Sequence, residues 1–246
     1  MAASPKLRWA VCTPAVLGLA LAHTLPSAAQ VADQTKYLFL MAQEFEQAPG
    51  LEGQPLRLDA EGWYGGDYNR LWVKVEGEAA TDSRGGDVEV QALFSLLLAP
   101  YWDVQVGVRV DRGWGDVDNT RTHLAIGIQG LAPYWFEVEA ALFVGAGGDV
   151  STRLTGGYDL LVTQRMILES QIDLNASLQE VPELGLGSGL TDLEFGFRLR
   201  YEVRREFAPY VGLAWRKAFA GTADFARLAG TRVRDSTFVA GLRVWY

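Results

Sequence analysis

Cysteine is almost absent from this sequence. The 246 residues include one cysteine, Cys12, and it lies in an N-terminal segment that we expect to be removed. The remaining chain would form no disulfide bond and would offer no thiolate ligand to a metal ion. The stability of the mature protein must therefore come from another source.

Long apolar runs are missing from everything after the first 25 residues. A helix that crosses a membrane needs about 20 consecutive apolar residues. The composition therefore excludes a transmembrane helix in this part of the chain. It does not exclude a membrane barrel, because the strands of a barrel give a much weaker hydropathy signal.

The N-terminus has the pattern of an export signal. Lys6 and Arg8 precede an apolar run over residues 9–25, and small residues follow it. This order is typical of a secretory signal peptide, so we assign residues 1–29 to the signal and 30–246 to a single mature domain. An N-terminal anchor helix is the alternative, but the run is short for a span and a proline interrupts it.

Histidine and methionine are scarce as well. After residue 29 the chain contains one histidine, His123, and two methionines, Met41 and Met166. Hydrolases that use a Ser–His or Asp–His pair need a positioned histidine. The neighbours of His123 on the same face of its strand are Arg121 and Ala125, and neither is a nucleophile. We therefore expect a protein that is not an enzyme.

Basic residues are fewer than acidic ones. The sequence has 22 Lys and Arg against 30 Asp and Glu, and removal of the signal takes two more basic residues. The mature chain would carry a net charge of about −10. An exported chain with this charge is not expected to bind nucleic acid.

What the sequence has in abundance is alternation of apolar and charged residues. In DLEFGFRLRYEVR, residues 192–204, one face carries Asp, Glu, Gly and Arg, and the other carries Leu, Phe, Tyr and Val. A period of two predicts a β-strand with unlike faces. We predict twelve strands, most about ten residues long, which is the length of a tilted strand that crosses a bilayer. The alternation is clear at 70–78, 87–98, 102–111, 121–129, 135–144 and 237–246, and weaker at 36–46, 54–64, 150–162, 165–177 and 207–217.

The breaks between these strands alternate between tight turns and longer loops. Short turns on one side and long loops on the other are typical of an outer-membrane barrel, with the short turns in the periplasm. The tripeptide Ala-Pro-Tyr occurs at three of the tight turns. The tight turns are expected at 65–67, 99–101, 132–134, 163–164 and 205–206, and the longer loops at 47–53, 79–86, 112–119, 145–149, 178–188 and 218–236.

Aromatic residues gather at the tight turns, as in the interfacial girdle of a membrane barrel. A soluble β-sandwich would show the same alternation with its faces inverted, but it would place its aromatics along the strands. We therefore predict an all-β protein, a transmembrane antiparallel β-barrel of about 12 strands. The residues assigned to the girdle are Trp63, Tyr64, Tyr68, Tyr101, Trp102, Tyr134, Trp135, Phe136, Tyr210, Trp245 and Tyr246.

In such a barrel the apolar faces meet lipid and the charged faces line the lumen. Paired with each other, the lumen charges would form a salt-bridged wall. Unpaired carboxylates would attract cations. Met41 and Met166 fall on the lipid-facing side of their strands. The acidic candidates are Glu76, Glu78, Glu137, Glu139, Asp192 and Glu194, and their basic partners are Arg70, Lys74, Arg198, Arg200 and Arg204.

One metal site is conceivable among these residues. Glu137 and Glu139 lie two apart on one strand, and His123 lies on the neighbouring strand. Two carboxylates and an imidazole suit Cu(II) about as well as zinc or nickel. A role of His123 as an ordinary polar residue of the lumen wall is the alternative.

Six sequence runs resemble the CopB/PcoB family of outer-membrane copper resistance proteins. The resemblance covers nearly all of 36–246, and it implies a barrel that takes part in periplasmic copper handling alongside a multicopper oxidase and soluble copper carriers. Members of that family often carry a Met- and His-rich segment before the barrel, and only residues 30–36 could hold one here. The runs are WYGGDYNRLW at 63–72, GLAPYWFEVE at 130–139, GSGLTDLE at 187–194, RLRYE at 198–202, RREFAPY at 204–210 and FVAGLR at 238–243.

From the resemblance and the acidic lumen we expect a copper resistance protein in the outer membrane of a Gram-negative cell. It would bind copper ions or pass them through the lumen, surrounded by outer-membrane lipid. A periplasmic multicopper oxidase or copper carrier is the expected protein partner. One alternative is a general small-solute channel that has lost its metal site, and another is a structural or docking barrel whose lumen is closed by salt bridges.

Overall fold

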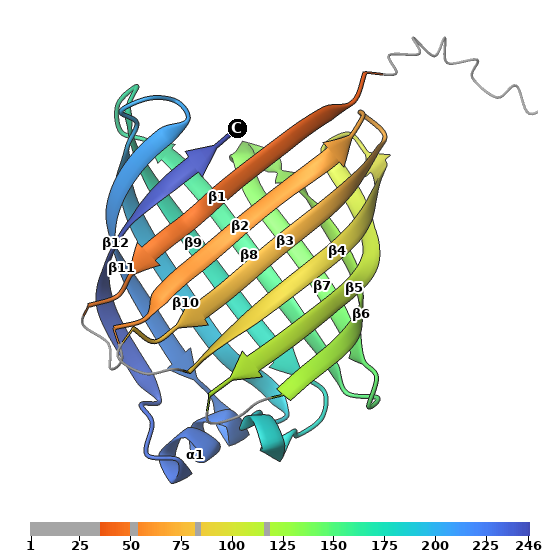
Figure 1. Ribbon diagram of the computed structural model, residues 1–246, viewed down its shortest axis with the longest axis vertical. Coiled ribbons are helices and arrows are strands. Elements are labelled where there is room, and N and C mark those ends of the chain that lie inside the picture. Colours follow the sequence, from red (N-terminus) through yellow and green to blue (C-terminus); the bar gives the residue numbers. More distant parts are fainter. Residues whose placement is uncertain (1–34, 50–53, 82–84, 116–118) are drawn as a thin grey trace, which may run out of the picture. The chain divides into compact units, whose positions relative to one another are not determined.

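The computed structural model describes residues 35–49, 54–81, 85–115 and 119–246. The signal peptide expected at 1–29 lies outside these residues. The described elements are twelve strands, two short 3-10 helices and one α-helix (Figure 1). In chain order they are β1 (Tyr37–Gln47), β2 (Leu56–Gly65), β3 (Asn69–Ala79), β4 (Gly86–Ala99), β5 (Trp102–Trp114), β6 (Asn119–Ala132), η1 (Pro133–Trp135), β7 (Phe136–Gly145), β8 (Val150–Leu161), β9 (Met166–Ser177), η2 (Pro182–Leu184), β10 (Gly189–Tyr201), β11 (Phe207–Ala218), α1 (Ala220–Leu228) and β12 (Arg234–Trp245).

The strands close into one antiparallel barrel. Each strand pairs with the next along the chain, and β1 pairs with β12 to complete the ring. Leu40 and Tyr246 exchange two backbone hydrogen bonds at this seam, with N–O distances of 3.0 and 2.8 Å. Closure leaves no open sheet edge. An open edge would not be tolerated in a membrane, because an unpaired amide in hydrocarbon costs several kcal/mol. The predicted fold class and the predicted number of strands are confirmed.

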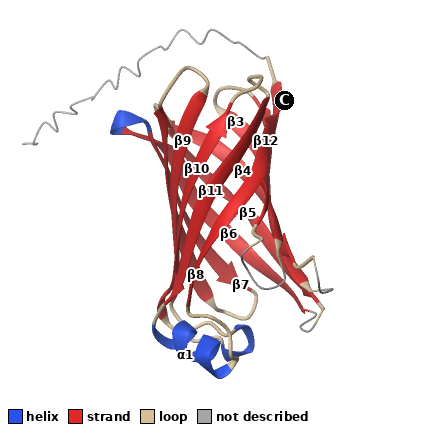
Figure 2. Ribbon diagram, turned by 90° about the vertical axis from the view of Figure 1, so that its left-hand side faces the viewer, coloured by secondary structure: helices blue, strands red, loops and turns tan. Residues whose placement is uncertain are grey.

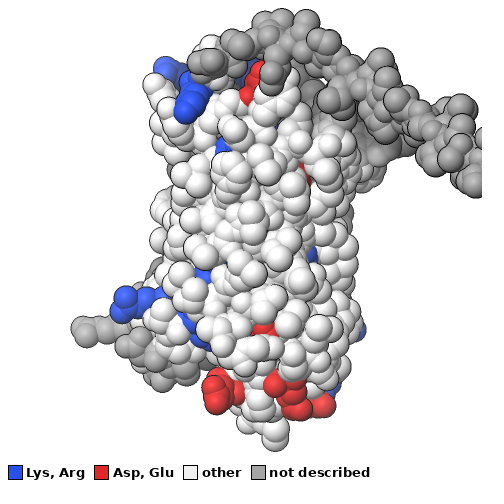
Figure 3. All heavy atoms as spheres, turned by 90° about the vertical axis from the view of Figure 1, so that its right-hand side faces the viewer, with Lys and Arg blue, Asp and Glu red and all other residues white. Residues whose placement is uncertain are grey.

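The outer surface of the barrel is apolar. On β10, Phe197 and Leu199 are 40% and 39% exposed, whereas Arg198 and Arg200 between and beside them are 4% and 6% exposed. Figure 3 shows one side of the molecule, where charged atoms are few over the middle of the barrel and gather toward its ends. The expected orientation, with apolar faces outward and charged faces inward, is therefore confirmed. Among the described residues, no helix has the length and apolar character that a membrane-crossing helix needs.

The two ends of the barrel differ. At one end, here called the short-turn end, the connections β2–β3, β4–β5, β6–β7, β8–β9 and β10–β11 are brief, and the C-terminus lies there (Figure 2). At the other, the long-loop end, η2 and α1 lie together across the end of the barrel (Figure 2). Tyr101 and Tyr134 take left-handed backbone angles, with φ of 69° and 67°, where the Ala-Pro-Tyr tripeptides turn the chain.

The third Ala-Pro-Tyr tripeptide does not form a turn. Arg204 and Phe207 close the β10–β11 turn with two backbone hydrogen bonds of 3.2 Å, so the residues after Phe207 already belong to β11. Tyr210 is 5% exposed and donates a hydrogen bond from its hydroxyl to Glu46 inside the barrel. The assignment of Tyr210 to the interfacial girdle is therefore wrong. Tyr64, Tyr68, Tyr101, Tyr134 and Trp135 are all exposed, as expected of aromatic residues near the short turns.

A β-bulge in β1 changes which of its residues face the lumen. Ala42 pairs with Ala60 but Glu44 pairs with Asp59, so Gln43 is an extra residue that shifts the alternation. Met41 consequently lines the lumen, where its sulfur lies 3.3 Å from the guanidinium of Arg243. The prediction that Met41 faces lipid is wrong, because a bulge reverses the faces on either side of it.

Candidate functional site in the barrel lumen

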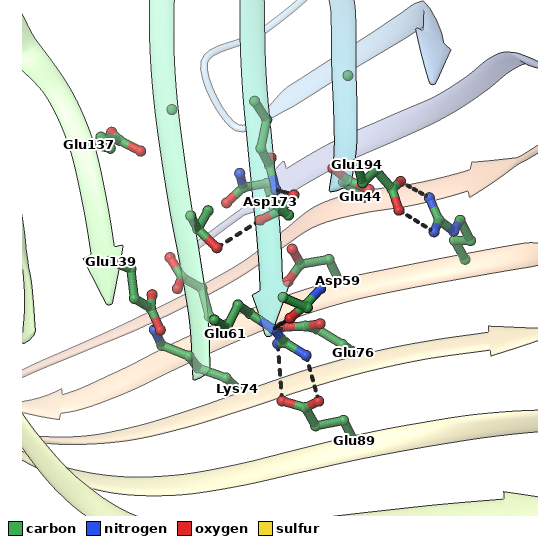
Figure 4. Close-up of a pocket in the computed structure, with 18 of the residues that line it drawn as sticks. Glu44, Asp59, Glu61, Lys74, Glu76, Glu89, Glu137, Glu139, Asp173 and Glu194 are labelled. Carbon is green, nitrogen blue, oxygen red and sulfur yellow. Dashed lines mark hydrogen bonds and ion pairs between the residues drawn. The ribbon is translucent and has the colours of Figure 1, made fainter. Parts of the chain in front are cut away.

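The lumen contains a long polar cavity of about 1140 Å³. Its lining residues come from every strand and from both ends, from Tyr101 near the short turns to Thr222 of α1. Fourteen acidic and nine basic side chains line it, so the described wall has an excess of five carboxylates. Figure 4 shows part of this wall, with carboxylates of several strands turned toward one another. The cavity is therefore an environment that favours cations over anions.

An apolar core fills part of the lumen. Trp72, Leu93, Ala125 and Phe143, from β3, β4, β6 and β7, pack together with exposures of 5% or less. Of these four, only Trp72 reaches the cavity. The sequence analysis did not identify this core. Leu93 and Phe143 occupy positions on the face of their strands that is otherwise polar. These breaks in the alternation were the signal in the sequence that could have revealed the apolar core.

The wall of the cavity is mostly polar or ionic. Its lining includes Glu44, Asp59, Glu61, Lys74, Glu76, Arg153, Thr155, Gln171, Asp173, Glu194 and Arg198 from β1, β2, β3, β8, β9 and β10. Glu89 of β4 and Arg109 of β5 line it as well, and Arg109 lies over the Phe143 ring of the apolar core.

Most of the predicted lumen charges are paired with an opposite charge. Arg57 Nη1 lies 2.5 Å from Glu194 and its Nε lies 2.9 Å from Glu78, and Arg216 also contacts Glu194 at 2.7 Å. Lys74 pairs with Glu139 across the lumen. Four more of the predicted charges have partners that the sequence did not indicate: Glu76 pairs with Arg153, Arg70 with Asp103, Arg198 with Glu44 and Glu46, and Arg200 with Asp159 and Glu169. Asp192 instead accepts hydrogen bonds from the neutral Asn175 and Thr191.

Four carboxylates in the cavity have no partner of this kind. Asp59, Glu61, Asp87 and Glu137 make no hydrogen bond or ion pair within 4 Å in the described part of the chain. The charged groups that act on Asp59 are mostly carboxylates, namely Glu76, Glu61 and Asp173, and Lys74 opposes them. Sequence reasoning singled out Glu137 but missed Asp59 and Glu61, because the alternation of β2 is weak and only its register with β3 places them inward.

Asp173 resembles these four residues in having no basic partner. Its carboxylate accepts hydrogen bonds from the Thr155 hydroxyl at 2.7 Å and from the Gln171 amide at 3.0 Å. Both donors are neutral, so the charge of Asp173 stays uncompensated by any residue bonded to it. Together with Asp59 and Glu61 it makes this part of the cavity anionic.

His123 does not approach Glu137 and Glu139. Antiparallel pairing places His123 opposite Gly145, whereas Glu139 lies opposite Gln129, six residues further along β6. At about 3.3 Å per residue this separation is roughly 20 Å. The proposed site of one histidine and two glutamates is therefore wrong. Nowhere in 35–49, 54–81, 85–115 or 119–246 do three His, Cys, Asp or Glu residues meet as a group that could hold a metal ion.

His123 lies instead between two aspartates near the long-loop end. Its Nδ1 is 3.6 Å from Asp111 and its Nε2 is 3.5 Å from Asp149, and the side chain is buried. Both aspartates are also bound by arginines, Asp111 by Arg109 at 2.6 Å and Asp149 by Arg121 at 2.5 Å. This arrangement attaches the β7–β8 loop to the wall, and His123 does not line the cavity.

Arg204 is not a lumen residue. β10 ends at Tyr201, so the alternation that suggested an inward Arg204 does not continue in the structure. Arg204 lies exposed in the β10–β11 turn, where its backbone bridges to Phe207. Arg200, in contrast, is 6% exposed inside the barrel.

Comparisons with known proteins agree with this architecture. Residues 36–246 match the family model described as copper resistance protein B precursor (CopB). The chain is 43% identical over 184 residues to copper resistance protein B of Escherichia coli, covering 75% of this chain and 61% of that protein's length. It is 39% identical over 227 residues to a copper resistance protein B homolog of Pseudomonas syringae pv. tomato, covering 92% of this chain and 76% of that protein.

A similar barrel is known among solved structures. The NanC porin superposes with a TM-score of 0.53 and 13% identity, covering 85% of this chain and 99% of that one. At this level of identity the similarity concerns the fold alone.

Proposed function

Since the chain belongs to the copper resistance protein B family, we propose that it supports copper resistance by passing copper ions through its acidic lumen. It would do so in the outer membrane of a Gram-negative cell, without catalysing a reaction. Its short-turn end would face the periplasm, where a multicopper oxidase or a soluble copper carrier would exchange the ion.

The observation that carries this proposal is the excess of carboxylates along one continuous cavity. Asp59, Glu61 and Glu137 line this cavity and have no basic partner among the described residues. Carboxylate oxygens are acceptable ligands for Cu(II), which also binds imidazole. A cation would find several successive carboxylates between the two ends of the barrel.

The charges of the cavity wall fit the passage of copper ions better than their tight binding. Conduction needs sites that attract an ion but hold it weakly enough to release it to the next one. The nine basic side chains that line the same cavity oppose strong binding of a cation. Lys74, paired with Glu139 and close to Asp59, is placed to weaken binding in the middle of the passage.

Complementation of a deletion strain tests the proposal. The strain would receive the wild-type gene, the triple variant Asp59→Asn/Glu61→Gln/Glu137→Gln, or the control Asp67→Asn/Glu206→Gln. The two control residues are exposed at the short-turn end and lie outside the cavity. Growth would be measured against Cu(II) concentration, with barrel content of the outer membrane determined by immunoblot.

We expect the wild type and the control to restore copper tolerance and the triple variant to fail at equal barrel content. Full rescue by the triple variant would contradict passage through the acidic lumen. If that variant also conducts sugars and simple ions as the wild type does, the protein is a general small-solute channel. A wild-type barrel that conducts nothing and leaves copper tolerance unchanged would point to a structural or docking role.

A further inference from the structure

Arg153 forms the widest ion-pair bridge across the described lumen. It projects from β8 and binds Glu76 on β3, and four strands separate β8 from β3 around the ring. The other pairs that cross the lumen, such as Arg57 with Glu194 and Lys74 with Glu139, span three intervening strands. In a closed ring of twelve strands, the Arg153 bridge runs close to a diameter.

The guanidinium of Arg153 is held on several sides. Its Nη1 donates to Glu76 at 2.7 Å, its Nη2 donates to Glu89 at 2.9 Å, and its Nε donates to Asn175 at 3.2 Å. A planar fork that binds two carboxylates has a defined position, unlike the single ammonium of a lysine. The bridge is therefore expected to be rigid.

The apolar core supports the same bridge from one side. The Arg153 guanidinium carbon lies 5.8 Å from the centre of the Phe143 ring, and that of Arg109 lies 4.4 Å from it. Arg109 also binds Glu89 at 2.7 Å, so the two arginines share one carboxylate above one ring. Phe143 is 1% exposed and cannot move aside without disturbing the core.

The other side of the bridge faces the anionic passage. Among the charged groups that act on Arg153 is Asp173, which has no basic partner of its own. Figure 4 shows Asp59, Glu61 and Glu76 gathered near the arginine that binds Glu89. A fixed positive charge therefore borders the cavity where its carboxylates are most concentrated.

From this geometry we infer that Arg153 is the residue that determines the width and the charge selectivity of the passage. Its side chain lies between the apolar core and the unpaired carboxylates of the cavity. Its charge neutralises Glu76 and Glu89, which would otherwise add to the cation-attracting wall. The inference rests on the proposed function only in taking the lumen as the route of the ion.

Single-channel recording in planar lipid bilayers tests the inference. The purified barrel would be recorded in KCl, with the reversal potential measured under a salt gradient. Arg153→Gln removes the charge and the fork, Arg153→Lys keeps the charge but cannot bridge both glutamates, and Glu89→Gln removes one anchor. Arg205→Gln is the control, because Arg205 is exposed in the β10–β11 turn and pairs only with Glu202. Heat-modified migration in gels would confirm that each barrel is folded.

We expect Arg153→Gln to raise the conductance at least about twofold and to shift the reversal potential toward that of K⁺. Arg153→Lys should raise the conductance with less change in selectivity, and Glu89→Gln should shift the reversal potential in the opposite direction. A wild type that conducts nothing while Arg153→Gln conducts would support the inference as well.

Two results would overturn it. One is a folded Arg153→Gln barrel whose conductance and reversal potential equal those of the wild type and of Arg205→Gln, even if its thermal stability falls. The other is the absence of conductance in all of these barrels. Neither result depends on copper, so failure of this inference is distinguishable from failure of the proposed function in the complementation test.

Discussion

The ion-pair network of Arg198 makes a quantitative prediction about stability. The guanidinium lies 2.7 Å from Glu44 and 3.0 Å from Glu46, and the three side chains are 5%, 9% and 0% exposed. Tyr210 adds a hydrogen bond of 3.0 Å to Glu46. Replacing Arg198 by methionine would leave two neighbouring buried carboxylates without their main partner. Arg57, 3.9 Å from Glu46, is the nearest remaining cation.

Removal of one partner from a buried pair costs about 3–5 kcal/mol, because the other charge stays desolvated. We therefore expect Arg198→Met to lower the free energy of unfolding by about this amount. The triple variant Arg198→Met/Glu44→Gln/Glu46→Gln removes the stranded charges, and it should regain at least about half of the loss. Unfolding by urea in lipid vesicles, followed by tryptophan fluorescence, gives both values.

The free energies of unfolding of the two variants show whether uncompensated charge causes the loss of stability. If Arg198→Met loses less than about 1 kcal/mol, the network contributes no more than a surface ion pair would. If the triple variant is less stable than Arg198→Met, the cost comes from lost packing and not from uncompensated charge. Either result would refute the electrostatic account of this part of the lumen.

Three further predictions concern the outer face, the α1 cap and His123. Phe197→Lys, on the lipid face, should lower the free energy of unfolding of the barrel in vesicles by about 2–4 kcal/mol. Leu228→Lys, on the exposed helix α1, should leave that free energy unchanged. Equal effects of the two variants would contradict the assigned orientation of the strands. A Cβ on Gly187 would lie 2.5 Å from the Thr222 nitrogen, so Gly187→Ala should displace α1 and speed tryptic cleavage at Arg227, while Gly66→Ala, with no atom nearer than 3.5 Å, should not. Unchanged cleavage would show that this contact does not hold α1. His123→Asn should leave copper tolerance as in the wild type, because His123 does not line the cavity, and a clear loss of tolerance would contradict that.

Alternation and turn spacing were enough to predict the barrel, because both follow directly from a closed sheet in lipid. Residues such as Phe197 and Arg198 could be assigned to opposite faces from position alone. The prediction failed where the backbone departs from a period of two. Gln43 is an extra residue in β1, and nothing in its type announces a bulge, so Met41 was placed on the wrong face.

Partners across the lumen were beyond the reach of the sequence. The pairing of Arg153 with Glu76 joins strands that lie far apart in the ring, and no local pattern relates them. The error over His123 was avoidable. Antiparallel strands pair at equal distances from their turn, and counting from the turn at 133–135 places His123 opposite Gly145 rather than Glu139. Glu137 and Glu139 must therefore lie near the turn, at the other end of the strand.

The lumen also explains how a barrel without disulfides can combine a packed core with a polar cavity. A single closed sheet in lipid has no second layer, so any hydrophobic core must be built from inward-facing side chains. Barrels of about eight strands are filled by such side chains, and those of sixteen or more leave a water channel. With twelve strands, this protein places an apolar core on β3, β4, β6 and β7 beside a polar cavity. Under the proposed function, an ion would pass beside this packed core, and the wall that attracts the ion would also contain the ion pairs that cross the lumen.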